Sequence, residues 1–106
     1  MTSKELPIRI LLVRSWLHRL EPIRTALRAA GFSPSFVRVD IEPALHAALT
    51  RGGFDVVIID STLRRITREV VRARIGELRP GTPLVVLGSL HDLGARIAAV
   101  LEARRN

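Results

Sequence analysis

The chain has 106 residues, no cysteine, and a formal net charge of +7 from 17 basic and ten acidic residues. This length fits one domain, and the lack of cysteine excludes disulfides, thiolate nucleophiles and cysteine metal sites. The polar start Met1–Pro7 lacks the apolar stretch of a signal peptide, and no apolar run is long enough to span a bilayer. We therefore expect a single domain over residues 1–106 that is cytoplasmic and makes no membrane contact.

Four short aliphatic segments predict buried strands. Continuous runs of Val, Ile and Leu are typical of parallel strands that are covered on both faces. The second run is shorter than the first and alternates with Arg38, which indicates an edge strand. The predicted strands span residues 8–13, 36–39, 56–59 and 84–87.

Amphipathic patterns between and after these strands predict four helices, spanning residues 17–30, 41–51, 67–78 and 92–104. Gly31 is expected to end the first helix, and Asp40 to cap the second, which has Pro43 in its first turn. Strands and helices therefore alternate regularly along the chain. This order predicts an α/β protein with right-handed crossovers and a doubly wound parallel sheet.

Five segments follow one another along the chain: Arg9–Val13, Leu27–Phe32, Glu42–Leu49, Gly53–Asp60 and Pro83–Leu87. Together they resemble the receiver domain of response regulators, over about residues 8 to 89. No single segment is specific, but their order is that of the family. The resemblance implies an active pocket at the carboxyl edge of the sheet, where open α/β sheets generally place their ligand crevice.

The last part of the chain departs from that family, which continues with a helix, a fifth strand and a final helix. Here the segment Leu93–Leu101, which follows the fourth predicted strand, resembles the family's final helix more than its fourth helix. We therefore predict four strands in the order 2-1-3-4, helices on both faces and no fifth strand. The last helix is expected beside the first, because the first helix alone would leave half of its face of the sheet uncovered.

The resemblance also assigns positions in the pocket. It places the phosphoacceptor at Asp60, the two metal-binding acids at Arg14 and Ser15, and the hydroxyl residue at Gly88, next to Ser89. Such a set is a poor site for a divalent cation, so we expect no metal, no other cofactor and no catalytic residue. Arg14 and Asp60 end adjacent strands and could form an ion pair in the space of the missing metal. Alternatively, Asp60 hydrogen-bonds the turn that follows it.

Two further features could contact a partner. Trp16 follows the first strand and either fills the space of the metal site or is an exposed aromatic anchor. Arg65, Arg68 and Arg72 share one helical face that could contact phosphates or an acidic partner, although an ordinary solvated face is the favoured interpretation. Binding to nucleic acid is not expected, because the arginines are spread over the chain and no aromatic residues interleave with them.

The leading hypothesis is a pseudo-receiver that is not an enzyme: a phosphorylation-independent module for protein–protein interaction in bacterial signal transduction. One alternative is a receiver that is phosphorylated on Asp60, and another is a small basic protein associated with nucleic acid. Without a fifth strand, the fourth becomes an exposed edge, and exposed edges invite pairing. We therefore expect a protein partner in a signalling system, or a homodimer through this edge.

Overall fold

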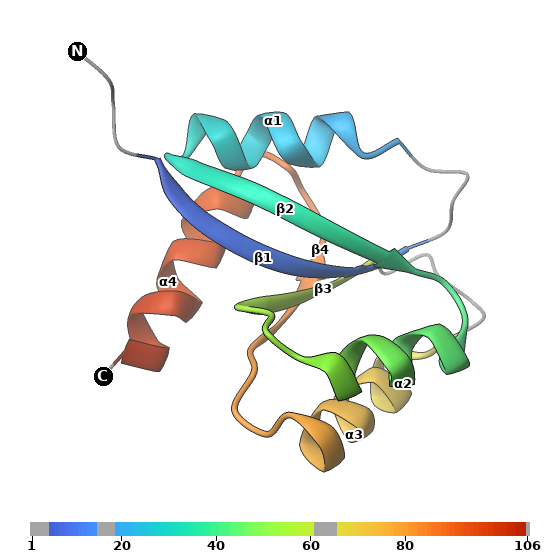
Figure 1. The fold of residues 1–106 in the computed structure, drawn as a ribbon. Helices are drawn as coiled ribbons and strands as arrows, with labels where there is room; N and C mark the ends of the chain where they lie inside the picture. The colour runs from blue at the N-terminus through green and yellow to red at the C-terminus, as the bar shows by residue number, and fades with distance from the viewer. Residues whose placement is uncertain (1–4, 15–18, 61–65, 106) are drawn as a thin grey trace.

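The computed structural model describes residues 5–14, 19–60 and 66–105. Within these ranges strands and helices alternate along the chain, as Figure 1 shows. The elements are β1 (Leu6–Val13), α1 (Glu21–Ala29), β2 (Phe32–Val39), α2 (Glu42–Arg51), β3 (Val56–Asp60), α3 (Arg68–Leu78), β4 (Leu84–Leu87) and α4 (Leu93–Arg105).

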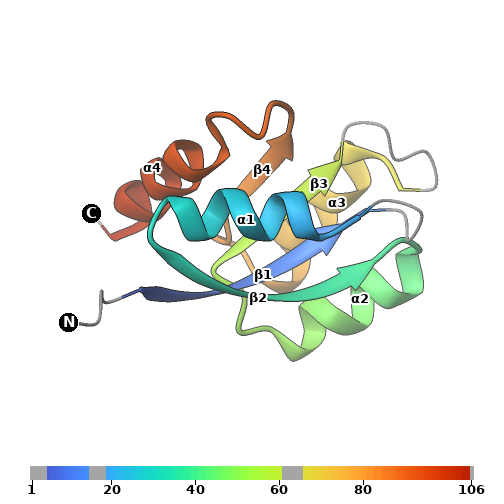
Figure 2. The same cartoon turned by 90° about the horizontal axis from the view of Figure 1, so that it is seen from above.

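The four strands form one parallel sheet in the order β2-β1-β3-β4, which confirms the predicted fold class and strand order. The registers place Val13 beside Val39 on one side and beside Ile59 on the other, so β1, β2 and β3 reach the carboxyl edge together. On β4, Leu87 pairs with Asp60 and reaches the same edge. The sheet is doubly wound, with α1 and α4 on one face and α2 and α3 on the other (Figures 1 and 2).

Alternate residues of the central strands feed two separate aliphatic cores. Ile10 and Leu12 of β1 pack toward α1 and α4, whereas Leu11 and Val13 pack toward α2 and α3. Both sets are fully buried. This explains the unbroken apolar run Ile10–Val13 of the strand, because each of its faces needs an apolar side chain there.

The last helix lies beside the first, as predicted, and Figure 2 shows the two over the same face of the sheet. Leu93 and Ile97 of α4 are fully buried in one core with Ile23 and Leu27 of α1. The helices approach so closely at Gly94 that a Cβ atom there would overlap the Cβ of Ala30.

Two predicted boundaries differ from the structure by four residues each. The second strand begins at Phe32 instead of Phe36, because Pro34 and its neighbouring serines hide a true alternation of buried and exposed residues. Proline is tolerated there since β2 is an edge strand. The first helix begins at Glu21 instead of residue 17, with Pro22 in its first turn, where a proline is well suited.

The predicted cap of the second helix is also wrong. Asp40 does not cap α2; the N-cap residue is Ile41, and no side chain caps the helix there. Glu42 instead places an acidic group in the first turn, where it interacts favourably with the helix dipole. The prediction for Gly31 is confirmed, since it follows α1 with a φ of +93°.

Over the described part of the chain, every helix is too short or too polar to cross a membrane.

Candidate functional site

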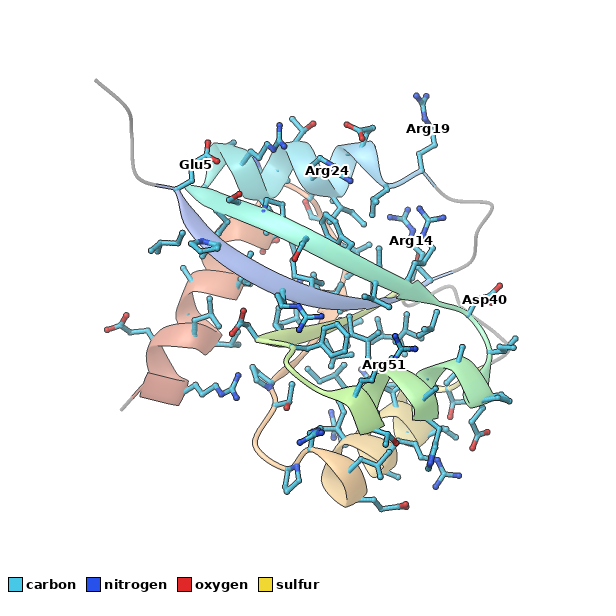
Figure 3. The ribbon with its side chains drawn as sticks, viewed as in Figure 1. Glu5, Arg14, Arg19, Arg24, Asp40 and Arg51 are labelled. Atoms are coloured by element: carbon cyan, nitrogen blue, oxygen red, sulfur yellow. The ribbon has the colours of Figure 1, made fainter. Side chains whose placement is uncertain are left out.

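The carboxyl edge of the sheet brings Arg14 and Asp60 together. Arg14 directly follows β1, and its backbone N–H donates to the carbonyl of Val39 at 2.9 Å, which continues the pairing with β2. Asp60 is the last residue of β3, the strand on the other side of β1. The Arg14 Nε atom lies 3.1 Å from Asp60 Oδ2, so the predicted ion pair is confirmed. Figure 3 shows Arg14 where β1 ends.

This ion pair is largely removed from water. The two side chains are 14% and 9% exposed, and Asp60 is the only buried polar or charged residue within the described ranges. The contact is electrostatic: Arg14 Nε has no partner in hydrogen-bond geometry. A buried carboxylate needs a compensating cation, and the guanidinium of Arg14 supplies one.

Two other predicted pocket residues lie at the end of β4. Gly88 follows Leu87, which pairs with Asp60, so it lies next to the ion pair along the edge. The Ser89 hydroxyl accepts a hydrogen bond from the backbone N–H of His91 at 3.1 Å, and it therefore helps to form the turn into α4.

Arg96 is a residue near this edge that the sequence did not indicate. It lies on α4, and its Nη1 atom would be 4.0 Å from a Cβ atom at Gly88. This places a second guanidinium beside the carboxyl end of β4. No sequence motif marks Arg96, because its position depends on how α4 crosses the sheet.

Several predicted site residues lie outside the described part of the chain. These are Ser15, Trp16 and Arg65, together with the turn after Asp60 that the alternative interpretation required. Arg68 and Arg72 are described and are exposed on α3, as the helical spacing predicts. Thr67 caps that helix, because its hydroxyl accepts from the Val70 N–H at 3.2 Å.

A separate charged contact joins α2 to α3. Arg74 Nη2 donates to Glu42 Oε1 at 2.7 Å, and Arg74 Nη1 donates to Glu77 Oε2 at 3.1 Å. The hydrogen bond to Glu42 and the negative charge of Glu77 raise the pKa of Arg74 above its ordinary value. This cluster is exposed and links the two helices on the face opposite α1 and α4.

The described residues contain no cluster of three or more histidines or carboxylates that could hold a metal ion. No protein-family model and no curated protein matches this chain. The fold and the site together define a four-stranded, doubly wound α/β protein with a buried Arg–Asp ion pair at its carboxyl edge.

Proposed function

We propose that the protein is a pseudo-receiver, which uses a receiver-like scaffold as a phosphorylation-independent adaptor in cytoplasmic signalling of bacteria. The observation that carries this proposal is the ion pair between Arg14 and Asp60. In the resemblance to receivers, Asp60 holds the position of the phosphoacceptor, and Arg14 replaces one of the acids that bind the metal.

The ion pair disfavours phosphoryl transfer for electrostatic reasons. A carboxylate that attacks a phosphoryl donor must approach several negative oxygens, and bound metal ions usually neutralise them. Arg14 brings one positive charge, but that charge is already compensated by Asp60 at 3.1 Å. We infer that the pocket stays in one electrostatic state, whereas a working receiver changes state when it is phosphorylated.

Incubation with acetyl phosphate and Mg²⁺, followed by intact-mass spectrometry, tests this part of the proposal. The expected result is no mass gain by the protein under conditions in which a working receiver gains one phosphoryl group. A gain that the Asp60→Asn variant loses would overturn the proposal and favour the phosphorylated receiver instead.

The free edge of β4 supports a role in binding another chain. In the described sheet β4 pairs only with β3, and residues 82–90, which contain it, carry no charged side chain. The opposite edge strand, β2, contains Pro34 and Arg38, which are typical of edges that resist pairing. On β4, Leu84 and Val86 are only partly buried. We therefore propose that β4 pairs with the β4 of a second copy, which would extend the sheet across a two-fold axis.

Sedimentation velocity over a range of protein concentrations tests this pairing. The expected result is a concentration-dependent dimer that the Val86→Lys variant abolishes, because it places a charge on the β4 edge. Val37→Lys is the matched control: Val37 is 40% exposed on β2, and its replacement should leave the dimer intact. A wild-type monomer at all concentrations, or equal loss in both variants, would contradict the pairing.

A further inference from the structure

Arginines from three separate elements gather at the amino edge of the sheet, opposite the Arg14–Asp60 pair. Arg9 lies on β1, Arg79 follows α3, and Arg104 is near the end of α4. All three donate to backbone carbonyls in the segment 49–55, which comprises the end of α2 and the connection to β3. This segment therefore has a collar of guanidinium groups, although it contains only one acidic residue, Asp55.

Hydrogen bonds to carbonyls orient two of these guanidinium groups. Arg79 donates from Nε to the Leu49 carbonyl at 2.9 Å and from Nη2 to the Thr50 carbonyl at 2.7 Å. Arg104 Nη1 donates to the Asp55 carbonyl at 3.1 Å. A guanidinium has five N–H donors, so these bonds leave further donors on both side chains. The carbonyls carry no formal charge, and within the described ranges neither guanidinium forms an ion pair with a carboxylate. The carbonyls of Leu49 and Thr50 offset the charge of Arg79 only through the dipole of α2.

Two glycines make room for this arrangement. A Cβ atom at Gly52 would lie 2.5 Å from the Arg79 guanidinium carbon, and one at Gly53 would overlap the guanidinium of Arg9. Both glycines have positive φ, +72° and +85°, which other residues rarely adopt. Arg9 also lies over the Phe54 ring, 5.1 Å from its centroid. The backbone of this segment is thus shaped to accept guanidinium groups.

A cavity of about 290 Å³ lies within this collar, and Arg79, Arg104 and Thr82 are among the residues that line it. The lining also contains one carboxylate, that of Asp55, which accepts a hydrogen bond from the Arg9 backbone N–H at 2.8 Å and is outnumbered by the two arginines. The cavity is near the lower end of the sizes found for small-molecule sites. Fixed guanidinium groups and a hydroxyl suit the several acceptor oxygens of a phosphate group.

We propose that this cavity is an anion site that binds the phosphate group of a small phosphate monoester, with Arg79 and Arg104 as its cationic ligands. The site lies at the edge of the sheet opposite Asp60, so it does not depend on the proposed function. Binding there would join the end of α4 to the end of α2.

Calorimetric titration with inorganic phosphate, with chloride adjusted to constant ionic strength, tests the proposal. We expect saturable binding to one site, weakened at least about tenfold in Arg104→Gln through loss of a charged donor. Arg28→Gln, which removes an exposed arginine from α1, is the matched control and should bind as the wild type does. Thr82→Val is a second variant, expected to weaken binding because it removes the hydroxyl of a residue that lines the cavity.

Circular dichroism shows whether each variant is folded, so that a loss of binding can be assigned to the site. The absence of saturable binding by the wild type would overturn the proposal. It would also be overturned if Arg104→Gln and Arg28→Gln weakened binding equally, because phosphate would then respond only to the net charge of the protein. Wild-type affinity in both Arg104→Gln and Thr82→Val would likewise contradict it.

Discussion

The two edges of the sheet use arginine in opposite ways. At the carboxyl edge, Arg14 faces the carboxylate of Asp60, and both side chains are largely buried. At the amino edge, Arg79 and Arg104 face backbone carbonyls and line an open cavity. A carboxylate neutralises the guanidinium that it binds, whereas a carbonyl holds the guanidinium in place and leaves its charge. We infer that the arginine of the carboxyl edge serves to neutralise Asp60, whereas the arginines of the amino edge keep positive charge for a ligand.

The largest expected effect on stability comes from removing the arginine of the carboxyl edge. The Arg14→Met variant should lower the free energy of unfolding by about 3 kcal/mol, because it leaves the buried Asp60 carboxylate without this cation. The double variant Arg14→Met/Asp60→Leu should recover most of the loss, since apolar residues can replace a buried ion pair without a net cost. Urea denaturation of the single and double variants measures both effects. A loss below about 0.5 kcal/mol in the single variant would mean that the pair acts as a surface salt bridge.

A pair of glycine variants compares the backbones of the two edges. Gly52→Ala should cost about 2 kcal/mol, because its φ of +72° and ψ of −161° suit glycine almost alone. The added methyl group would also displace the Arg79 guanidinium. Gly88→Ala is the control: its φ is not positive, and its Cβ would meet only Arg96 at an ordinary distance. Thermal unfolding should show little change for Gly88→Ala, and equal losses would contradict the comparison.

Arg79→Met should have a moderate effect on stability. We expect a loss of about 1 kcal/mol, because two carbonyls at the end of α2 would exchange a charged donor for water. Hydrogen exchange should become faster in the last turn of α2, and Arg28→Met should leave that turn unchanged. Unchanged exchange in Arg79→Met would show that Arg79 does not hold the end of this helix.

The smallest expected effect on stability is that of Arg104→Gln. This side chain is exposed and makes one hydrogen bond to a carbonyl, so the free energy of unfolding should change by less than about 0.5 kcal/mol. Denaturation in phosphate-free buffer measures this change. A loss as large as that of Arg14→Met would indicate that Arg104 is structural, and that the two edges do not differ in the way proposed.

Local patterns in the sequence determined the main elements and the central chemistry of the carboxyl edge. The nearly unbroken apolar run 8–13 and the continuous run 56–59 required strands that are covered on both faces, and regular alternation with helices required a parallel, doubly wound sheet. Residues that end neighbouring parallel strands reach the same edge, which is why the Arg14–Asp60 pair could be predicted. The place of α4 followed from the need to cover the face that α1 alone leaves open.

Only the tertiary structure decided which arginines, distant in sequence, lie close together at an edge of the sheet. The start of β2 was missed because its pairing with β1 outweighs the weak strand preference of Pro34 and its neighbouring serines. Arg79 and Arg104 are 25 residues apart in the printed sequence and belong to no motif. They line one cavity because α3 and α4 both end at the amino edge of the sheet. A side chain's length and charge can be read from sequence, but its partners depend on the crossing of helices that pack through nonspecific apolar contacts.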